Sequence, residues 1–483
     1  MGHPDGVTTR SSQLRAGRDP IPATRPRGTL AFVLPLLVAA AAGLALGLSP
    51  HAALAVEAAV LSALVLVLRL DWAALAVIAT AAFQDYLDLI SPWATQWLAG
   101  VLVLAWLVRR AQGPLHGPLP GSQHGHRLRV PALLVALLLG AVLIAYLAHP
   151  LGRPGLTVCA TYAEFAIVML ILADTLGGPL APHRAARVFV VSCVLASCCG
   201  LVTAIGSGRH QVAGPVASPD TLAFFLIAAV PLVGTVRSRE SQPVWWVWAC
   251  FVILLGAGIG TQSRPAFVAL VAMVVVAVAT GLLALRYAGA LLAVVLTAVA
   301  LLVAVLPMPI GQALTDPQRY ADTNISQRND LRMAAFEMTL ASPVVGLGPA
   351  SFALLHQDYA SVDDRGDGGD RAEPDLDTAY STVLEASAEL GVLGLGALYA
   401  VWLFPVIRAR GRWTDDRSGV TAATLLAAAG VFTAAALETQ QYTLPLWFLS
   451  AMLLALGRPE PRRTPVFGAV TSARSSGQVP PRS

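Results

Sequence analysis

The stretch "VPALLVALLLGAVLIAYLA", residues 130–148, decides the fold class because none of its side chains is charged. A helix rises 1.5 Å per residue, so a run of about 20 apolar residues crosses the hydrocarbon core of a bilayer. Backbone N–H and C=O groups find no water there and must pair with one another inside the segment, which favours a helix. We therefore predict that residues 130–148 form a transmembrane helix.

Comparable apolar runs recur along the chain. Of its 483 residues, 56% are hydrophobic and only 12% are charged, with a mean hydropathy of +0.67, whereas soluble domains carry about 25% charged residues. The pattern predicts an all-α, polytopic helical membrane protein with about 14 transmembrane helices (range about 12–14). The predicted spans are 29–48, 52–69, 71–88, 92–108, 130–148, 157–175, 188–206, 221–236, 243–261, 266–285, 288–307, 379–405, 418–437 and 442–457.

The basic residues predict how the chain is oriented. All 32 are arginines, and arginines concentrate in the cytoplasmic connections of membrane proteins. If the N-terminus is cytoplasmic, most arginines in the connections fall inside, and an even number of spans returns the C-terminus to the same side. We expect a multi-pass protein of the cytoplasmic (plasma) membrane with both termini in the cytoplasm.

The spans divide the chain into five parts. Residues 308–378 form the longest connection, which we place outside the cell between the eleventh and twelfth helices. Part of this loop is helix-like, because "DLRMAAFEMTLA" (330–341) sets Leu331, Ala335 and Met338 on one face, and "GLGPASF" (346–352) predicts a turn. The other parts are a disordered cytoplasmic N-terminus (1–28), transmembrane helices 1–11 (29–307), transmembrane helices 12–14 (379–457) and a disordered cytoplasmic tail (458–483).

Several arginines fall on the predicted outer side, against the general bias. Arg328 and Arg332 are one helical turn apart and share a face, Arg264 lies between two spans with almost no loop, and Arg209 lies in a short loop. Arginine binds phosphate groups bidentately and keeps its charge when partly desolvated. Such a cluster would suit a lipid-linked diphosphate. The alternative is interfacial snorkelling, or salt bridges to the acidic residues of the loop.

One segment carries a family resemblance. "QRNDLRMAAFEMTLASPVVGLGPASF" (327–352) resembles the signature of the O-antigen ligase and polymerase family, and "GTQSRPAFVAL" resembles that family's Ser-Arg step. "LDTAYSTVLEASAELG" is similar to a third family segment, His-Asn-x-Tyr-Leu-x-x-x-x-Glu-x-Gly. Two positions depart from the family, since Arg332 replaces an aromatic residue and Asp220 replaces the usual Asn. The resemblance extends over roughly residues 190–457, and its matching residues are Ser263, Arg264, Arg328, Ala335, Pro343, Gly346, Gly348, Phe352, Leu384, Glu389 and Gly391.

The resemblance implies a membrane glycosyltransferase. It would transfer or polymerise glycan from a polyprenyl-diphosphate-linked donor onto an acceptor glycan hydroxyl at the outer face of the membrane, without a metal or other cofactor. The expected partners are that donor, a glycan or glycolipid acceptor, the lipid bilayer and other polysaccharide-assembly proteins. No basic patch with interleaved aromatic residues suggests nucleic acid. Whether the reaction is ligation or polymerisation stays open.

The resemblance also assigns roles to residues. Arg264 and Arg328 would bind the diphosphate, with Arg209 and Arg332 in support. Glu389, Ser263, Gly346 and Gly348 would support the site, and Glu389 is expected to pair with an arginine.

The family's catalytic histidine position holds Tyr380 here. A phenol has a pKa near 10, so it is a poor base at neutral pH, yet it could orient the acceptor. Tyr380 and the nearby Asp377 are therefore the catalytic candidates, and the alternative role of Tyr380 is an interfacial aromatic anchor.

Two other classes of function compete with the enzyme. A transporter or flippase of lipid-linked glycan would suit the number of spans, but its two halves should show internal repeats, and none is evident. An inactive scaffold of a glycan-assembly complex is the second alternative, which the tyrosine at the histidine position leaves open.

Overall fold

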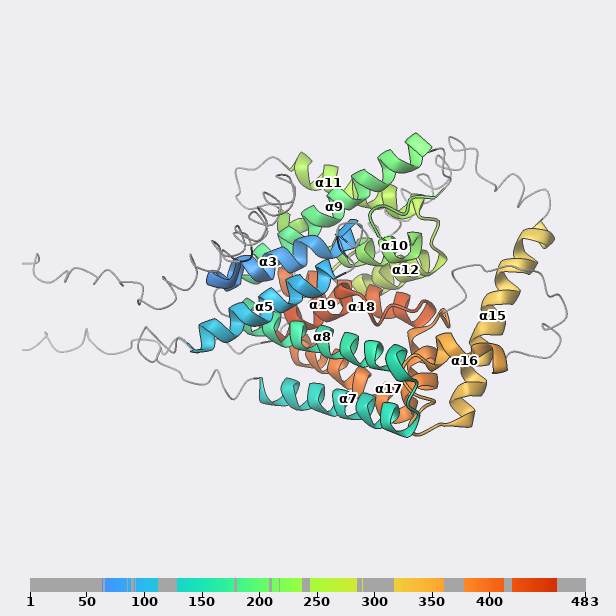
Figure 1. Cartoon of the computed structure of the whole chain (residues 1–483). Coiled ribbons are helices and arrows are strands. Elements are labelled where there is room, and N and C mark those ends of the chain that lie inside the picture. Colours follow the sequence, from blue (N-terminus) through green and yellow to red (C-terminus); the bar gives the residue numbers. More distant parts are fainter. Residues whose placement is uncertain are drawn as a thin grey trace, which may run out of the picture. The chain divides into compact units, whose positions relative to one another are not determined.

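The computed structural model describes residues 63, 66–84, 86–87, 91, 93–111, 128–177, 180–207, 211–216, 218–236, 244–284, 289, 317–359, 378–411 and 419–457. Every regular element among them is a helix (Figure 1). The elements are α3 (Leu70–Thr80), η1 (Ala81–Phe83), α5 (Ala94–Ala111), α7 (Arg129–Ala148), α8 (Gly152–Leu176), α9 (Pro182–Ser207), α10 (Pro219–Ala229), η2 (Val230–Val236), α11 (Trp245–Gly260), α12 (Arg264–Ala279), α15 (Pro317–Ala341), α16 (Ser351–Tyr359), α17 (Thr382–Arg410), α18 (Val420–Leu437) and α19 (Leu444–Leu456).

The helices confirm an all-α membrane protein. Within the described part of the chain, five helices are long and apolar enough to cross a membrane, namely α7, α8, α9, α17 and α18. Shorter apolar helices accompany them at Leu70–Phe83, Pro219–Thr235, Trp245–Gly260, Arg264–Ala279 and Leu444–Leu456. The predicted spans 29–48, 52–69 and 288–307 lie wholly or largely outside the described residues. The total of about 14 therefore stays a prediction.

Most predicted spans coincide with helices, and their differences have local causes. The stretch 130–148 forms α7, as predicted. The span predicted at 221–236 divides into α10 and the 3₁₀ helix η2. Pro231 lies just past this junction, and because proline has no N–H to donate, the regular α-helical bonding stops there. The span predicted at 266–285 ends as a helix at Ala279, shortly before Gly281, whose φ is +71°.

Two helices begin with side-chain caps at one end of the bundle. The Ser218 hydroxyl accepts a hydrogen bond from the Thr221 N–H at 3.1 Å, and Pro219 occupies the first turn of α10. The Ser381 hydroxyl accepts one from the Leu384 N–H at 3.4 Å at the start of α17. Serine caps satisfy N–H groups that lack a partner in the first turn. These caps set where both helices begin.

The apolar core joins the transmembrane helices. α18 packs against α10, α12, α17 and α19, while α17 also packs against α7. Large rings fill the interior, since the Phe189 and Phe448 rings lie 4.9 Å apart and the Trp402 and Trp447 rings lie 5.7 Å apart. Ring pairs at such distances add to the stabilisation from burial. The core therefore holds the ends of α10, α17 and α18 in a defined arrangement.

Two helices of the predicted outer loop cover the end of the bundle at which α17 begins (Figure 1). The predicted buried face of α15 is confirmed, because Leu331, Ala335 and Met338 are buried together with Phe352 of α16. The turn predicted at 346–352 is shorter than expected, since α16 already begins at Ser351. The early start of α16 places the Phe352 ring in this small apolar cluster with Leu331, Ala335 and Met338.

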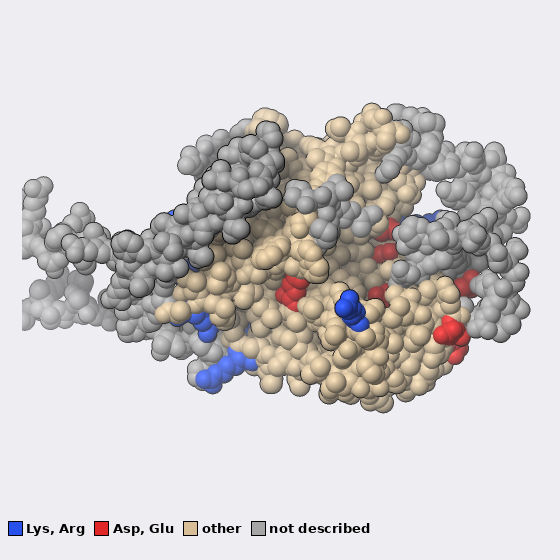
Figure 2. All heavy atoms as spheres, in the orientation of Figure 1, with Lys and Arg blue, Asp and Glu red and all other residues tan. Residues whose placement is uncertain are grey.

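Charged side chains are sparse on the flank of the bundle and gather toward its ends (Figure 2). Arg109, Arg110, Arg408 and Arg410 lie in the last turns of α5 and α17. α17 begins at the other end, where α15 lies. A flank with few charges suits contact with lipid chains, and charged ends suit contact with water and headgroups.

Candidate functional site

Arg328 is the centre of a charged cluster at the end of the bundle covered by α15. Its guanidinium lies 3.4 Å from the Asp220 carboxylate at the start of α10 and 3.7 Å from the Glu438 carboxylate just after α18. The same guanidinium lies 4.2 Å above the Tyr380 ring, a cation–π contact. Residues far apart in the sequence therefore meet at one arginine, whose side chain is 31% exposed.

Arg332 ties three segments of the chain together, one turn further along α15. Its Nε and Nη2 donate to the Tyr380 carbonyl at 3.3 and 3.0 Å, and Nη2 donates to the Leu437 carbonyl at 3.1 Å. These bonds join α15 to the segment before α17 and to the end of α18. They support a structural role for Arg332 beside Arg328, because its donors already bind backbone carbonyls.

Tyr380 has an unusual backbone conformation, with φ at +49°. A non-glycine residue in this left-handed region is uncommon and is found at sites where the surroundings impose it. The bonds from Arg332 to its carbonyl and the stacking of Arg328 on its ring supply that constraint. The structure thus places Tyr380 against the two arginines and leaves its catalytic role a prediction.

Glu438 lies beside Arg328 and is buried, with 10% of its side chain exposed. Its backbone carbonyl accepts hydrogen bonds from the Thr382 N–H at 3.2 Å and the Thr382 hydroxyl at 3.0 Å, which fixes its position. Its Oε2 lies within ion-pair distance of Arg328 but has no hydrogen-bond partner. Burying a carboxylate oxygen without a hydrogen-bond donor costs free energy. Binding of a ligand donor or of a proton at Oε2 would remove this cost.

The surroundings of Glu438 favour its neutral form. Burial raises its pKa to about 8, and the neighbouring Asp220 carboxylate acts in the same direction. Arg328 and Arg332 oppose this rise in pKa, and Glu385 adds to it. Loss of solvation therefore outweighs the two arginines, and the balance favours the neutral acid over the anion.

Glu385 is also buried, and its carboxylate oxygens have hydrogen-bond donors. It accepts hydrogen bonds from the Ala379 N–H at 3.0 Å, the Thr439 hydroxyl at 2.8 Å and the Gln441 side-chain amide at 2.9 Å. These partners lie before α17 and between α18 and α19. Glu385 therefore joins the two segments that flank the arginines, which is a structural role for a buried acid.

Glu389 has different partners from those we expected. The sequence favoured a pairing with an arginine, but its described partners are the Tyr442 hydroxyl at 3.3 Å and the backbone amides of Ala350 and Phe352. Those amides belong to the beginning of α16, and a helix N-terminus is a favourable site for a carboxylate. Glu389 thus anchors α16 to α17, and the expected arginine partner was wrong.

The glycine-rich turn after α15 inserts into a kink of α17. Gly346 and Gly391 have φ of +77° and +64°, and a Cβ atom on either would lie 2.3 Å from the backbone of the other segment. The Leu347 and Gly348 amides donate to the Ala388 and Glu389 carbonyls at 2.8 and 3.0 Å. Only residues without a side chain allow backbones to approach so closely. Gly346 and Gly391 therefore fix how the turn after α15 packs against α17, and a supporting role of Gly346 and Gly348 in the site stays a prediction.

Arg264 and Ser263 lie at the same end of the bundle as Arg328. The Val212 N–H, seven residues before α10, donates to the Gly260 carbonyl at the end of α11 at 3.0 Å, so α12 begins near the start of α10. Ser263 is buried at the first position before α12, and Arg264 is exposed. No described contact joins Arg264 to Arg328, so their joint action stays a prediction.

Two predicted site residues, Arg209 and Asp377, lie outside the described residues. The sequence reading missed Glu438. One signal was available, because "ETQQ" (438–441) is a polar run between two apolar spans. An acid at the end of a span is usually a solvated residue, so this run alone does not predict a functional one. The contact with Arg328 makes Glu438 a candidate site residue.

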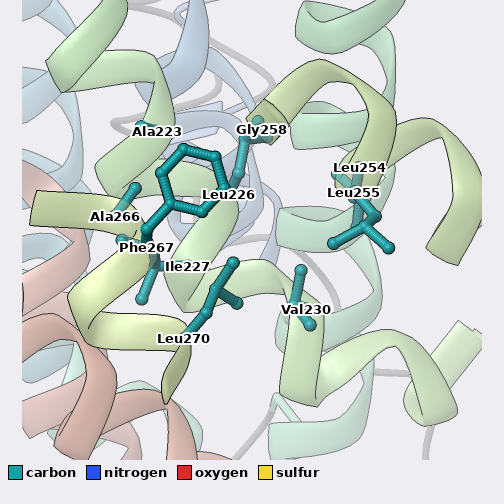
Figure 3. Close-up of a pocket in the computed structure, with 10 residues that line it drawn as sticks. All are labelled: Ala223, Leu226, Ile227, Val230, Leu254, Leu255, Gly258, Ala266, Phe267 and Leu270. Carbon is teal, nitrogen blue, oxygen red and sulfur yellow. The ribbon is translucent and has the colours of Figure 1, made fainter. Parts of the chain in front are cut away.

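A small apolar groove lies between α10, η2, α11 and α12 (Figure 3). Its lining consists of Ala223, Leu226, Ile227, Val230, Leu254, Leu255, Gly258, Ala266, Phe267 and Leu270. None of these side chains carries a hydrogen-bonding group, so the groove does not supply the polar contacts that an anionic group needs. The chemistry of the site lies with the charged cluster around Arg328.

Residues 249–399, about a third of the chain, match the family model described as O-antigen ligase. The match includes α15, the glycine-rich turn and the first part of α17. No curated protein gives a match to the chain.

Proposed function

We propose that this chain, whose residues 249–399 match the O-antigen ligase family model, transfers or polymerises glycan from a polyprenyl-diphosphate donor onto an acceptor hydroxyl. The family supports a ligase or glycosyltransferase type of enzyme that acts in glycan assembly on lipid-linked substrates. The observation that carries the finer proposal is the position of Arg328 between two acids and an aromatic ring, at a charged end of an apolar bundle.

The proposed reaction places Arg328 on the leaving group. The acceptor oxygen attacks the anomeric carbon of the donor sugar, a C–O bond forms, and the bond from that carbon to the diphosphate oxygen breaks. Negative charge grows on the departing diphosphate, so a positioned guanidinium stabilises the transition state more than the ground state. The long contacts of Arg328 with Asp220 and Glu438 leave its donors available to a stronger anion.

The other predicted residues take supporting roles in this proposal. Tyr380 holds the guanidinium of Arg328 through its ring, and Arg332 holds Tyr380 through its carbonyl. Arg264 and Arg209 are proposed to add positive charge near the diphosphate. Asp377, three residues before Tyr380, stays a candidate for orienting the acceptor hydroxyl or accepting its proton.

The test replaces Arg328 in cells that make the polymer. We expect Arg328→Ala to lower polymer formation about 100-fold or more, a typical loss for a group that stabilises developing charge. Lipid-linked glycan should then accumulate at the outer leaflet, measured by extraction and by labelling with an impermeant reagent. Membrane levels of the variant must match those of the unchanged chain.

Arg153→Ala is the matched control, because Arg153 is an exposed arginine in the first turn of α8 and takes no part in the cluster. We expect it to support normal polymer levels. Accumulation of the intermediate on the cytoplasmic side would favour a flippase instead. Normal polymer in the Arg328→Ala variant would refute the assignment of Arg328.

A further inference from the structure

We infer that Glu438 is part of the donor site and binds the diphosphate as a neutral carboxylic acid, donating an O–H hydrogen bond beside Arg328. This inference rests on the proposed function. It assigns to Glu438 a binding role that differs from that of a base, and it makes donor affinity depend on the protonation of one buried side chain.

The geometry points to a hydrogen bond that is still to be made. The Oε2 atom of Glu438 is buried, has no hydrogen-bond partner and lies 3.7 Å from the guanidinium of Arg328. An anion bound to Arg328 would therefore lie next to this oxygen. Glu385 shows the contrast, because three donors surround its carboxylate and leave it no need of a ligand. The two acids have different roles at the same end of the bundle.

Burial is the main influence on Glu438, and three neighbouring elements add charges. Asp220 of α10 and Glu385 of α17 disfavour its anion, while Arg328 and Arg332 of α15 favour it. Burial adds to the effect of the two acids, and the balance raises its pKa to about 8. A diphosphate anion beside it would raise the pKa further, because two neighbouring negative charges repel. The neutral acid is thus the form that fits a bound donor.

A role as base would require the opposite arrangement. A base lies on the side of the attacking hydroxyl, whereas the diphosphate leaves from the opposite face of the sugar carbon in an in-line displacement. Glu438 and Arg328 are too close to one another to act on opposite faces while in contact. A protonated carboxyl that donates to developing negative charge is an established way to stabilise an anion in a buried site.

The experiment measures binding of a polyprenyl diphosphate to the purified full-length chain at pH 6.5 and pH 9. We expect the unchanged protein to bind about tenfold more tightly at pH 6.5 than at pH 9, because with a pKa of about 8 only about a tenth of the free Glu438 side chains are protonated at pH 9. Glu438→Gln keeps a neutral donor, so it should bind within about threefold of the unchanged protein's low-pH affinity at both values. Glu438→Ala should bind weakly at both.

The Gln variant also separates titration of Glu438 from titration of the lipid diphosphate. The lipid titrates in the same way whichever of the three proteins is present. A parallel loss of affinity with pH in the unchanged and Gln proteins would overturn the inference, as would Gln binding as weakly as Ala in folded protein. Glu438→Gln binding normally but losing all transfer would identify a base instead. If the unchanged protein binds no polyprenyl diphosphate at pH 6.5, the proposed function fails as well.

Discussion

At the scale of single residues, the position of Arg328 depends on an aromatic ring. Its guanidinium lies 4.2 Å above the centre of the Tyr380 ring, while the Tyr380 carbonyl is held by Arg332. Cation–π contacts contribute about 0.5–2 kcal/mol, depending on how far they are desolvated. Tyr380 can therefore matter to the reaction through its ring face as well as through its hydroxyl.

Substitutions at Tyr380 distinguish the two roles. We expect Tyr380→Phe to keep transfer within about threefold of normal, because the ring stays beneath Arg328, and Tyr380→Leu to lower it about tenfold. The measurement is the initial rate of glycan transfer by purified protein. A loss of about 100-fold or more in the Phe variant would show that the hydroxyl itself takes part in the reaction, as a base or hydrogen-bond donor.

The sequence drew attention to residues whose type was unusual for their place, and the structure brings three of them into contact. Arg328 and Arg332 attracted attention as arginines on the outer side, and Tyr380 as the residue at a histidine position. Glu438 and the true partners of Glu389 were not predictable, because they depend on contacts between segments about 40 to 110 residues apart in the sequence. No local pattern encodes such contacts.

At the scale of elements, two glycines hold the helices of the site together. The turn from Pro343 to Gly348 lies in the kink of α17 at Gly391, and the Val392 N–H donates to the Pro343 carbonyl at 2.9 Å. The kink also divides α17 into a short first part, which carries Glu385 and Glu389, and a longer second part. Both the direction of α15 and the position of Arg328 therefore depend on this backbone contact.

Alanine at either glycine should disrupt the contact. We expect Gly346→Ala and Gly391→Ala to lower the free energy of unfolding by about 2 kcal/mol or more, and so to lower the unfolding temperature. Each substitution combines a positive φ with an overlap between the new Cβ atom and the other backbone segment. Gly396→Ala is the matched control in the same helix, because a Cβ atom there meets nothing within 4 Å. The measurement is the unfolding temperature in detergent. Equal unfolding temperatures for all three variants would show that the contact does not hold the site.

Elements with strong apolar patterns were predictable, and those shaped by tertiary contacts were less so. α7 follows from an uncharged run of residues 130–148, and the buried face of α15 follows from its helical spacing. The kink at Gly391 and the start of α16 at Ser351 did not follow, because packing against another segment determines both. The spacing of apolar residues predicts which face of a helix is buried, but it does not predict which segment packs against that face.

At the scale of the whole molecule, the proposed reaction requires the Arg328 end to face the outside of the cell. The arginine-rich turns that end α5 and α17 lie away from the start of α17, near which Arg328 and Arg332 lie. The positive-inside rule predicts that those turns are cytoplasmic. The orientation itself is a prediction, as are the two cytoplasmic termini.

Labelling of single cysteines tests this orientation. Met333→Cys places a thiol on an exposed position of α15, and Arg410→Cys places one on an exposed position at the far end of α17. A membrane-impermeant thiol reagent should label Met333→Cys in intact cells and Arg410→Cys only after permeabilisation. The unsubstituted chain, with its five native cysteines, provides the background. The reverse pattern would contradict an outward-facing site.

The central claim is that the charged cluster at Arg328 transfers glycan from a polyprenyl diphosphate. The most direct measurement supplies purified protein in lipid vesicles with a polyprenyl-diphosphate-linked glycan and an acceptor glycan, and follows product formation and release of polyprenyl diphosphate. We predict product with the unchanged protein and with Arg153→Ala, and a rate reduced by about 100-fold or more with Arg328→Ala. Folded protein that forms no product, or equal rates with and without Arg328, would contradict the account.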